Sequence, residues 1–145
     1  MTTIIEFLEA RIAEDEAVAR AATPGPWAVQ TAEEGTTTYW GIEDVVPIGI
    51  NMEWSSWEST IDTAETAAHI ARFDPARMLA ECKAKRAILA LHVCRCPDAG
   101  CTDCGECSGR HHADPEPFPC DTVKTLAQVY ADHSDFDQAW SVSDV

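Results

Sequence analysis

The stretch Phe73–His92, FDPARMLAECKAKRAILALH, carries the strongest secondary-structure signal in the chain. Asp74 followed by Pro75 is typical of a helix start, because the aspartate accepts hydrogen bonds from unpaired backbone N–H groups and proline already has a helical φ angle. After this start, Cys82 and Leu89 fall on one face of a helix. The sequence therefore predicts a long helix here, with Cys82 as a small core residue.

The residues before this helix predict another long helix and a small sheet. Thr3 and Glu6 have the spacing of a capping box, and apolar residues follow at helical spacing. Between residues 27 and 50 the chain is rich in β-branched and aromatic residues interrupted by Gly and Pro, which indicates short antiparallel strands with a turn at Glu33-Glu34-Gly35. Asp62, with Glu65 three residues later, is expected to cap the next helix.

These signals together predict one α+β domain over residues 1–140, in which a small antiparallel sheet packs with three or four helices. Its expected elements, in chain order, are a helix over 3–22, strands within 27–50, helices over 62–73 and 75–92, a Cys-rich metal-binding loop over 94–120, a helix over 121–132 capped by Asp121, and a frayed tail over 141–145.

Acidic residues dominate the charge of the chain. The 145 residues include 25 Asp and Glu against 10 Lys and Arg, for a formal net charge of −15. Nucleic-acid affinity comes mostly from Lys and Arg, so ordinary nucleic-acid binding is disfavoured. Two readings remain, namely a solvated acidic surface and an acidic face that binds a basic partner, which includes a DNA mimic. The run Glu14-Asp15-Glu16 is expected to be solvated.

No apolar run approaches the length of about 20 residues that spans a bilayer, and the N-terminal residues are acidic, unlike a signal peptide. The expected location is the cytoplasm, with no membrane partner, or the host cytoplasm if the protein is encoded by a phage.

The cysteines are concentrated in one segment. Six of the seven lie between residues 94 and 120, and His92 and His112 lie close by. Thiolates two residues apart on a tight turn bind one metal together, and a remote ligand closes the loop. The preferred ligands of a closed structural Zn²⁺ site are Cys104, Cys107, Cys120 and His92. The alternates are Cys101, His112, Cys94 and Cys96.

Other uses of these cysteines stay open. Cys101, Cys104, Cys107 and Cys120 also match iron–sulfur spacing, and redox-active or unliganded thiols are a third reading. A disulfide framework fits neither the odd number of cysteines nor the lack of a signal peptide.

Several segments outside the strands and the Cys-rich loop resemble segments of known proteins. They are Phe7–Glu16, His69–Arg77, Ala84–Leu89 with Leu91-His92, Pro119–Thr122, and Tyr130–His133 with Trp140. These segments resemble a family of small uncharacterised proteins from actinobacteria and their bacteriophages. The resemblance implies an accessory role in a phage or prophage. No catalytic residues carry over, because the family is assigned none.

The functional expectation is binding rather than catalysis. Trp54 and Trp57, separated by two serines, either form an exposed aromatic anchor for a partner or cover the sheet. His69 and His133 are candidate acid–base groups, although single histidines are more often structural. The working hypothesis is a zinc-stabilised accessory protein that binds a host protein. The alternatives are a DNA-mimic inhibitor of a nucleic-acid-binding host protein and an iron–sulfur or zinc-dependent enzyme.

Overall fold

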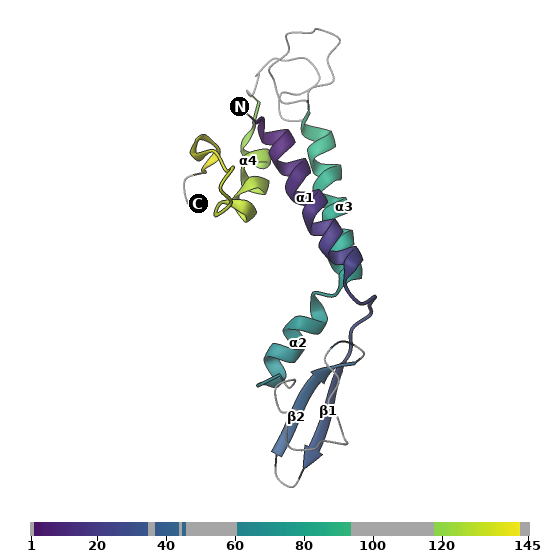
Figure 1. The fold of residues 1–145 in the computed structure, drawn as a ribbon. Coiled ribbons are helices and arrows are strands. Elements are labelled where there is room, and N and C mark those ends of the chain that lie inside the picture. Colours follow the sequence, from purple (N-terminus) through teal and green to yellow (C-terminus); the bar gives the residue numbers. More distant parts are fainter. Residues whose placement is uncertain (1, 35–36, 44, 46–60, 94–117, 143–145) are drawn as a thin grey trace. The chain divides into compact units, whose positions relative to one another are not determined.

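The computed structural model describes residues 2–34, 37–43, 45, 61–93 and 118–142. Over these residues the fold is α+β, with four α-helices, two short 3-10 helices and one two-stranded antiparallel sheet (Figure 1). In chain order the elements are α1 (Ile4–Ala21), β1 (Val29–Glu34), β2 (Thr37–Ile42), α2 (Ala64–Arg72), α3 (Pro75–His92), α4 (Asp121–Ala127), η2 (Gln128–Tyr130) and η3 (Gln138–Trp140). The expected range of 75–92 for the third helix coincides with α3.

The chain forms two compact units. Unit 1 contains residues 1–15 and 82–145, and unit 2 contains residues 16–81. Helices α1 and α3 each contribute residues to both units, so each unit is described by itself below.

The core of unit 1 is built around the first half of α1. The capping box forms as predicted, because the Glu6 N–H donates to Thr3 Oγ1 at 3.2 Å and the Thr3 N–H donates to Glu6 Oε2 at 2.8 Å. The helix then buries Ile4, Phe7, Leu8 and Ile12 against residues from α3, α4 and the C-terminal residues. The spacing of the apolar residues predicts a stripe through Ile5, Leu8, Ile12 and Ala19, and the structure adds Ile4 and Phe7 to its buried residues.

Phe7 is the centre of an aromatic cluster. Its ring lies against four aromatic or imidazole rings from the end of the chain, with centroid distances from 5.1 to 6.3 Å; these rings belong to Tyr130, His133, Phe136 and Trp140. Three of these pairs are edge-to-face and the Phe7–Trp140 pair is tilted, and edge-to-face pairs add to the gain from apolar burial. Aromatic contacts with Phe7 thus help to hold the C-terminal residues against α1.

The last helix is shorter than the sequence predicted. Instead of a helix over 121–132, α4 ends at Ala127 and the chain continues as the 3-10 turn η2. Cys120, not Asp121, is the N-cap residue, and its side chain makes no capping hydrogen bond. Residues 128–140, here called the C-terminal strap, contain two short 3-10 helices and turns, and Tyr130, Phe136 and Trp140 of the strap contact Phe7.

Unit 2 contains the β-hairpin and α2. Strands β1 and β2 pair from Val29 with Ile42 to Glu34 with Thr37, so Glu33 and Glu34 belong to the strand and not to the expected turn. Trp40 also forms an antiparallel bridge with Ile61, just before α2. The expected strand residues after residue 45 lie outside the described residues. Ile42 and Ala67 are fully buried, so β2 and α2 share the core of this unit.

The N-cap of α2 differs from the expectation. Thr63, not Asp62, is the cap, and its hydroxyl accepts a hydrogen bond from the Thr66 N–H at 3.1 Å. Both residues are of a capping type, and the register of the helix selects Thr63. At the start of α3, by contrast, Asp74 caps as predicted and accepts from the Arg77 N–H at 2.8 Å.

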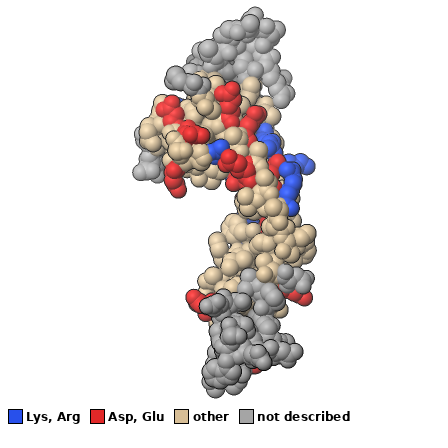
Figure 2. All heavy atoms as spheres, viewed as in Figure 1, with Lys and Arg blue, Asp and Glu red and all other residues tan. Residues whose placement is uncertain are grey.

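Charged side chains are unevenly spread over unit 1. On the face shown in Figure 2, Asp and Glu side chains lie across the surface, whereas Lys and Arg side chains gather along α3. The sequence places Lys83, Lys85 and Arg86 in that helix. No helix among the described residues is long and apolar enough to cross a membrane.

Candidate functional site

Two of the predicted metal ligands lie together in unit 1. His92 is the last residue of α3, and Cys120 directly precedes α4. His92 Nδ1 and Cys120 Sγ are 3.3 Å apart, although the two residues are 28 positions apart in the chain. Both are buried, with exposed fractions of 9% for His92 and 2% for Cys120. The end of α3 and the start of α4 thus bring a sulfur and a nitrogen donor into contact at one buried corner.

The distance between these donors fits shared coordination of one metal. At a tetrahedral Zn²⁺ with bonds of about 2.3 Å to sulfur and about 2.0 Å to nitrogen, two such ligand atoms lie about 3.5 Å apart. The pair is also compatible with a hydrogen bond between a thiol and an imidazole.

The other predicted site residues lie outside the described residues. These are Cys94, Cys96, Cys101, Cys104, Cys107 and His112 in the metal loop, and Trp54 and Trp57 in the proposed partner surface. Within the described ranges, no group of three or more His, Cys, Asp or Glu side chains is arranged to hold a metal. Of the four preferred ligands, the structure therefore describes two, His92 and Cys120.

Cys82 differs from Cys120 in its surroundings. It is fully buried in the middle of α3 and belongs to the apolar core of unit 1, as predicted from its place on the helix face. It thus serves as an internal comparison for Cys120, because the two buried cysteines belong to the same core but only Cys120 contacts His92.

A polar cluster joins the strap to both long helices of unit 1. Tyr130 Oη donates to Asp15 Oδ2 at 2.6 Å and accepts from Lys85 Nζ at 3.0 Å, and Lys85 Nζ is 3.6 Å from the same Asp15 oxygen. Burial, followed by the hydrogen bond to Asp15, raises the pKa of Tyr130 above its ordinary value. The phenol is therefore neutral at physiological pH and acts as a bridge between charges, not as a base.

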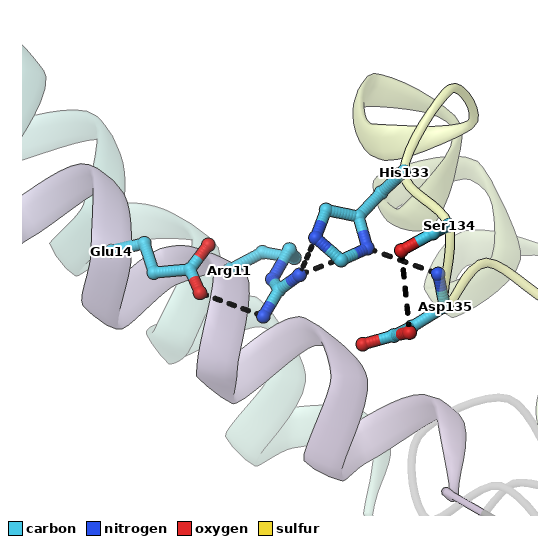
Figure 3. A network of polar contacts seen from close by, with 5 residues as sticks. All are labelled: Arg11, Glu14, His133, Ser134 and Asp135. Carbon is cyan, nitrogen blue, oxygen red and sulfur yellow. Dashed lines mark hydrogen bonds and ion pairs between the residues drawn. The ribbon is translucent and has the colours of Figure 1, made fainter.

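A second polar network links the strap to α1 (Figure 3). Arg11 Nη1 contacts both ring nitrogens of His133, and Arg11 Nη2 forms an ion pair with Glu14 Oε1 at 2.7 Å. The Asp135 N–H donates to His133 Nδ1 at 3.1 Å. His133, considered from the sequence as an acid–base group, is thus part of a structural contact between helix and strap.

The acidic run of α1 makes polar contacts within the chain, although Glu14 is exposed as expected. Glu14 pairs with Arg11, Asp15 with Tyr130 and Lys85, and Glu16 with Arg20. The partners at short range follow helical spacing and were visible in the sequence. Tyr130 is 115 residues from Asp15, so no local pattern could have indicated that contact.

His69, the other histidine considered for acid–base chemistry, lies against Phe73 in unit 2, with the two ring planes tilted by 47°. Its ring centroid is 4.7 Å from that of Phe73. The guanidinium carbon of Arg77 lies over the same Phe73 ring, 4.3 Å from its centroid. Arg77 Nε in turn donates to Glu81 at 2.8 Å. These side chains repeat every four residues and form a surface ladder across the junction of α2 and α3.

Fold and site together define a small α+β protein with a buried Cys–His pair where α3 ends and α4 begins. The chain belongs to a family of unknown function (DUF6221), whose family model matches residues 1–142. No curated protein and no solved structure matches the chain.

Proposed function

We propose that the protein is a small acidic zinc-binding accessory protein, in which a structural Zn²⁺ is bound by His92, Cys120, Cys104 and Cys107. The observation that carries the proposal is the 3.3 Å separation of His92 Nδ1 and Cys120 Sγ. Cys104 and Cys107 are proposed from their spacing in the sequence, with Cys101, His112, Cys94 and Cys96 as alternates.

The Cys–His pair favours zinc over an iron–sulfur cluster. Mixed sulfur and nitrogen ligands are typical of structural zinc sites, whereas [4Fe–4S] and most [2Fe–2S] clusters are bound by four cysteines. The predicted iron–sulfur set includes Cys120 but leaves out His92, although His92 contacts Cys120 directly. A structural metal also explains why a polar imidazole is buried at the end of a helix.

The same contact gives less support to an enzyme. A thiol and an imidazole at this distance form a nucleophilic pair in cysteine enzymes, where the sulfur must reach a substrate. Cys120 is only 2% exposed, and His92 9%. We therefore do not propose a catalytic role for the pair.

The biological part of the proposal rests on the sequence. The net charge of −15 favours a basic partner, and Trp54 and Trp57 are suited to an interface anchor. We propose that the partner is a host protein and that the protein acts in the cytoplasm during phage growth or prophage maintenance. A DNA mimic is less well supported, because Glu14, Asp15 and Glu16 pair with basic side chains of the chain itself.

Metal analysis of the full-length, untagged protein tests the zinc proposal. We expect one or more zinc ions per chain, no visible absorption, and loss of zinc in Cys120→Ser. Cys82→Ser is the matched control, because it removes a buried thiol of the same core without touching His92, and it should keep its zinc. Iron with a visible spectrum, or folded protein without metal, would refute the proposal.

Affinity capture tests the partner proposal. The full-length protein should retain a specific protein from a lysate of its host, and Trp54→Ala combined with Trp57→Ala should lose it. Retention of the same protein by the double variant, with unchanged zinc content, would show that the two tryptophans are not the anchor.

A further inference from the structure

We infer that protonation of His133 loosens the C-terminal strap from α1, so that mild acid uncovers aromatic side chains packed against Phe7. The inference concerns the polar network of Figure 3 and does not depend on the proposed metal site. Histidine is the side chain that ordinarily changes its charge between about pH 5 and 8. This network is therefore where mild acid acts on the contact between the strap and α1.

Both ring nitrogens of His133 face hydrogen-bond donors. The Asp135 N–H donates to Nδ1 at 3.1 Å, and Arg11 Nη1 contacts Nδ1 at 2.9 Å and also Nε2. A neutral imidazole has one lone pair with which it accepts from one of these donors, whereas an imidazolium has two N–H groups and no lone pair. Protonation therefore removes the acceptor that the ring offers to Arg11 and to the Asp135 N–H.

The charged groups near the ring leave a positive charge as its direct neighbour. On α1 these groups are Arg11, which contacts the ring, and Glu14, which is paired with Arg11 at 2.7 Å. On the strap they are Asp132 and Asp135, and the Asp135 carboxylate accepts from Ser134 Oγ at 3.4 Å. Among the residues that the structure describes, no carboxylate forms an ion pair with the ring. An imidazolium would thus meet a guanidinium first.

The next charged groups are already bound to one another. Asp15 of α1 and Lys85 of α3 are 3.6 Å apart and both contact the hydroxyl of Tyr130. They hold the strap at a neighbouring point, and their own contacts do not include His133. A charge on His133 is therefore not taken up by this pair.

The repulsion would act inside the aromatic contact between α1 and the strap. The Arg11 side chain is only 11% exposed, and its guanidinium carbon is 5.6 Å from the Phe7 centroid. The ring of His133 packs edge-on against the same Phe7 ring, with centroids 5.8 Å apart. A detached strap binds the proton without meeting Arg11, so a fall in pH shifts the equilibrium toward the detached state. Detachment uncovers Phe136 and Trp140, which are buried in the docked strap.

Amide hydrogen exchange measured by NMR on the full-length protein tests the inference, with each rate divided by the intrinsic rate at the same pH. The Phe136 amide donates to the His133 carbonyl and so reports on the strap. Between about pH 7.5 and about pH 5.5, we expect the protection of this amide to fall at least about threefold. Unchanged protection over this range would overturn the inference.

His133→Gln is the matched variant, because it keeps a hydrogen-bond acceptor, does not titrate, and leaves every other titratable group in place, including the proposed metal ligands. Its protection should fall by less than about half of the wild-type fall over the same pH range. An equal fall in the two proteins would assign the acid sensitivity to other groups and overturn the inference, whatever their zinc content.

Arg11→Met keeps the comparison decisive if His133→Gln does not fold. It removes the guanidinium and keeps a long side chain against Phe7, so His133 can take up its proton without repulsion. We expect weaker protection of the Phe136 amide at both pH values but a smaller fall on acidification than in the wild-type protein. A fall equal to that of the wild type would overturn the inference.

Discussion

At Gly25, the neighbouring Asp74, which caps the start of α3, leaves no room for a side chain. A Cβ atom at this position would lie 2.6 Å from Asp74 Oδ2, well inside contact distance. Asp74 cannot easily turn away, because its other oxygen accepts from the Arg77 N–H at the start of α3. The segment Thr23-Pro24-Gly25-Pro26 therefore approaches α3 as closely as it does because residue 25 has no side chain.

We predict that Gly25→Ala lowers the free energy of unfolding by about 1–3 kcal/mol, the usual range for overpacking. Urea denaturation measures this change. Asp74→Ala supplies the control, because it removes the oxygen that the new methyl group would meet and itself costs about 1 kcal/mol as a lost cap. In that background Gly25→Ala should have little effect, and a full additional loss of stability would contradict the proposed contact.

Because of Tyr130, we expect the free energy of unfolding to depend on pH at high pH. Burial and Asp15 raise the pKa of Tyr130 above the ordinary value, so the unfolded phenol loses its proton first as the pH rises. The stabilisation from this group is complete below about pH 10 and is lost as the pH rises through the higher folded-state pKa. Between about pH 10 and 11, the free energy of unfolding should fall more steeply in the wild-type protein than in Tyr130→Phe. Parallel curves from urea denaturation would argue against the buried hydrogen bond.

At the level of elements, the sequence predicted helix starts well where the two residues of a capping interaction lie within one helical turn. The Asp74–Pro75 start and the Thr3–Glu6 box are of this kind, and α3 spans its expected range. The end of α4 could not be predicted in this way. Val123, Leu126, Ala127 and Tyr130 have helical spacing, but the contacts of Tyr130 with Asp15 and Lys85 come from distant parts of the chain.

The N-cap of α2, which was expected at Asp62 and lies at Thr63, can be tested directly. Thr63→Ala should lower the free energy of unfolding by about 1 kcal/mol, because it removes the acceptor of the Thr66 N–H. Asp62→Ala is the matched control, one residue earlier, and should change stability by less than about 0.5 kcal/mol. The reverse order of effects in thermal or urea denaturation would place the cap at Asp62.

At the level of the whole molecule, the acidic composition has a structural as well as a surface role. The negative charge leads us to predict that ordinary nucleic-acid binding is disfavoured. Three consecutive acids of α1 nevertheless contact Arg11, Lys85, Tyr130 and Arg20 within the chain. Composition gives the total charge but not the partners, which depend on tertiary packing. For the same reason the sequence could name His92 and Cys120 among several ligands, and only the folded corner selects them as a pair.

Whether His92 and Cys120 bind one metal can be decided by NMR of the full-length wild-type protein loaded with NMR-active cadmium in place of zinc. This measurement needs no substitution and so does not depend on a variant's ability to fold. We expect one cadmium signal with scalar couplings both to the Cys120 Hβ protons and to the ring protons of His92. A cadmium signal coupled only to other cysteines, or no bound cadmium, would contradict it.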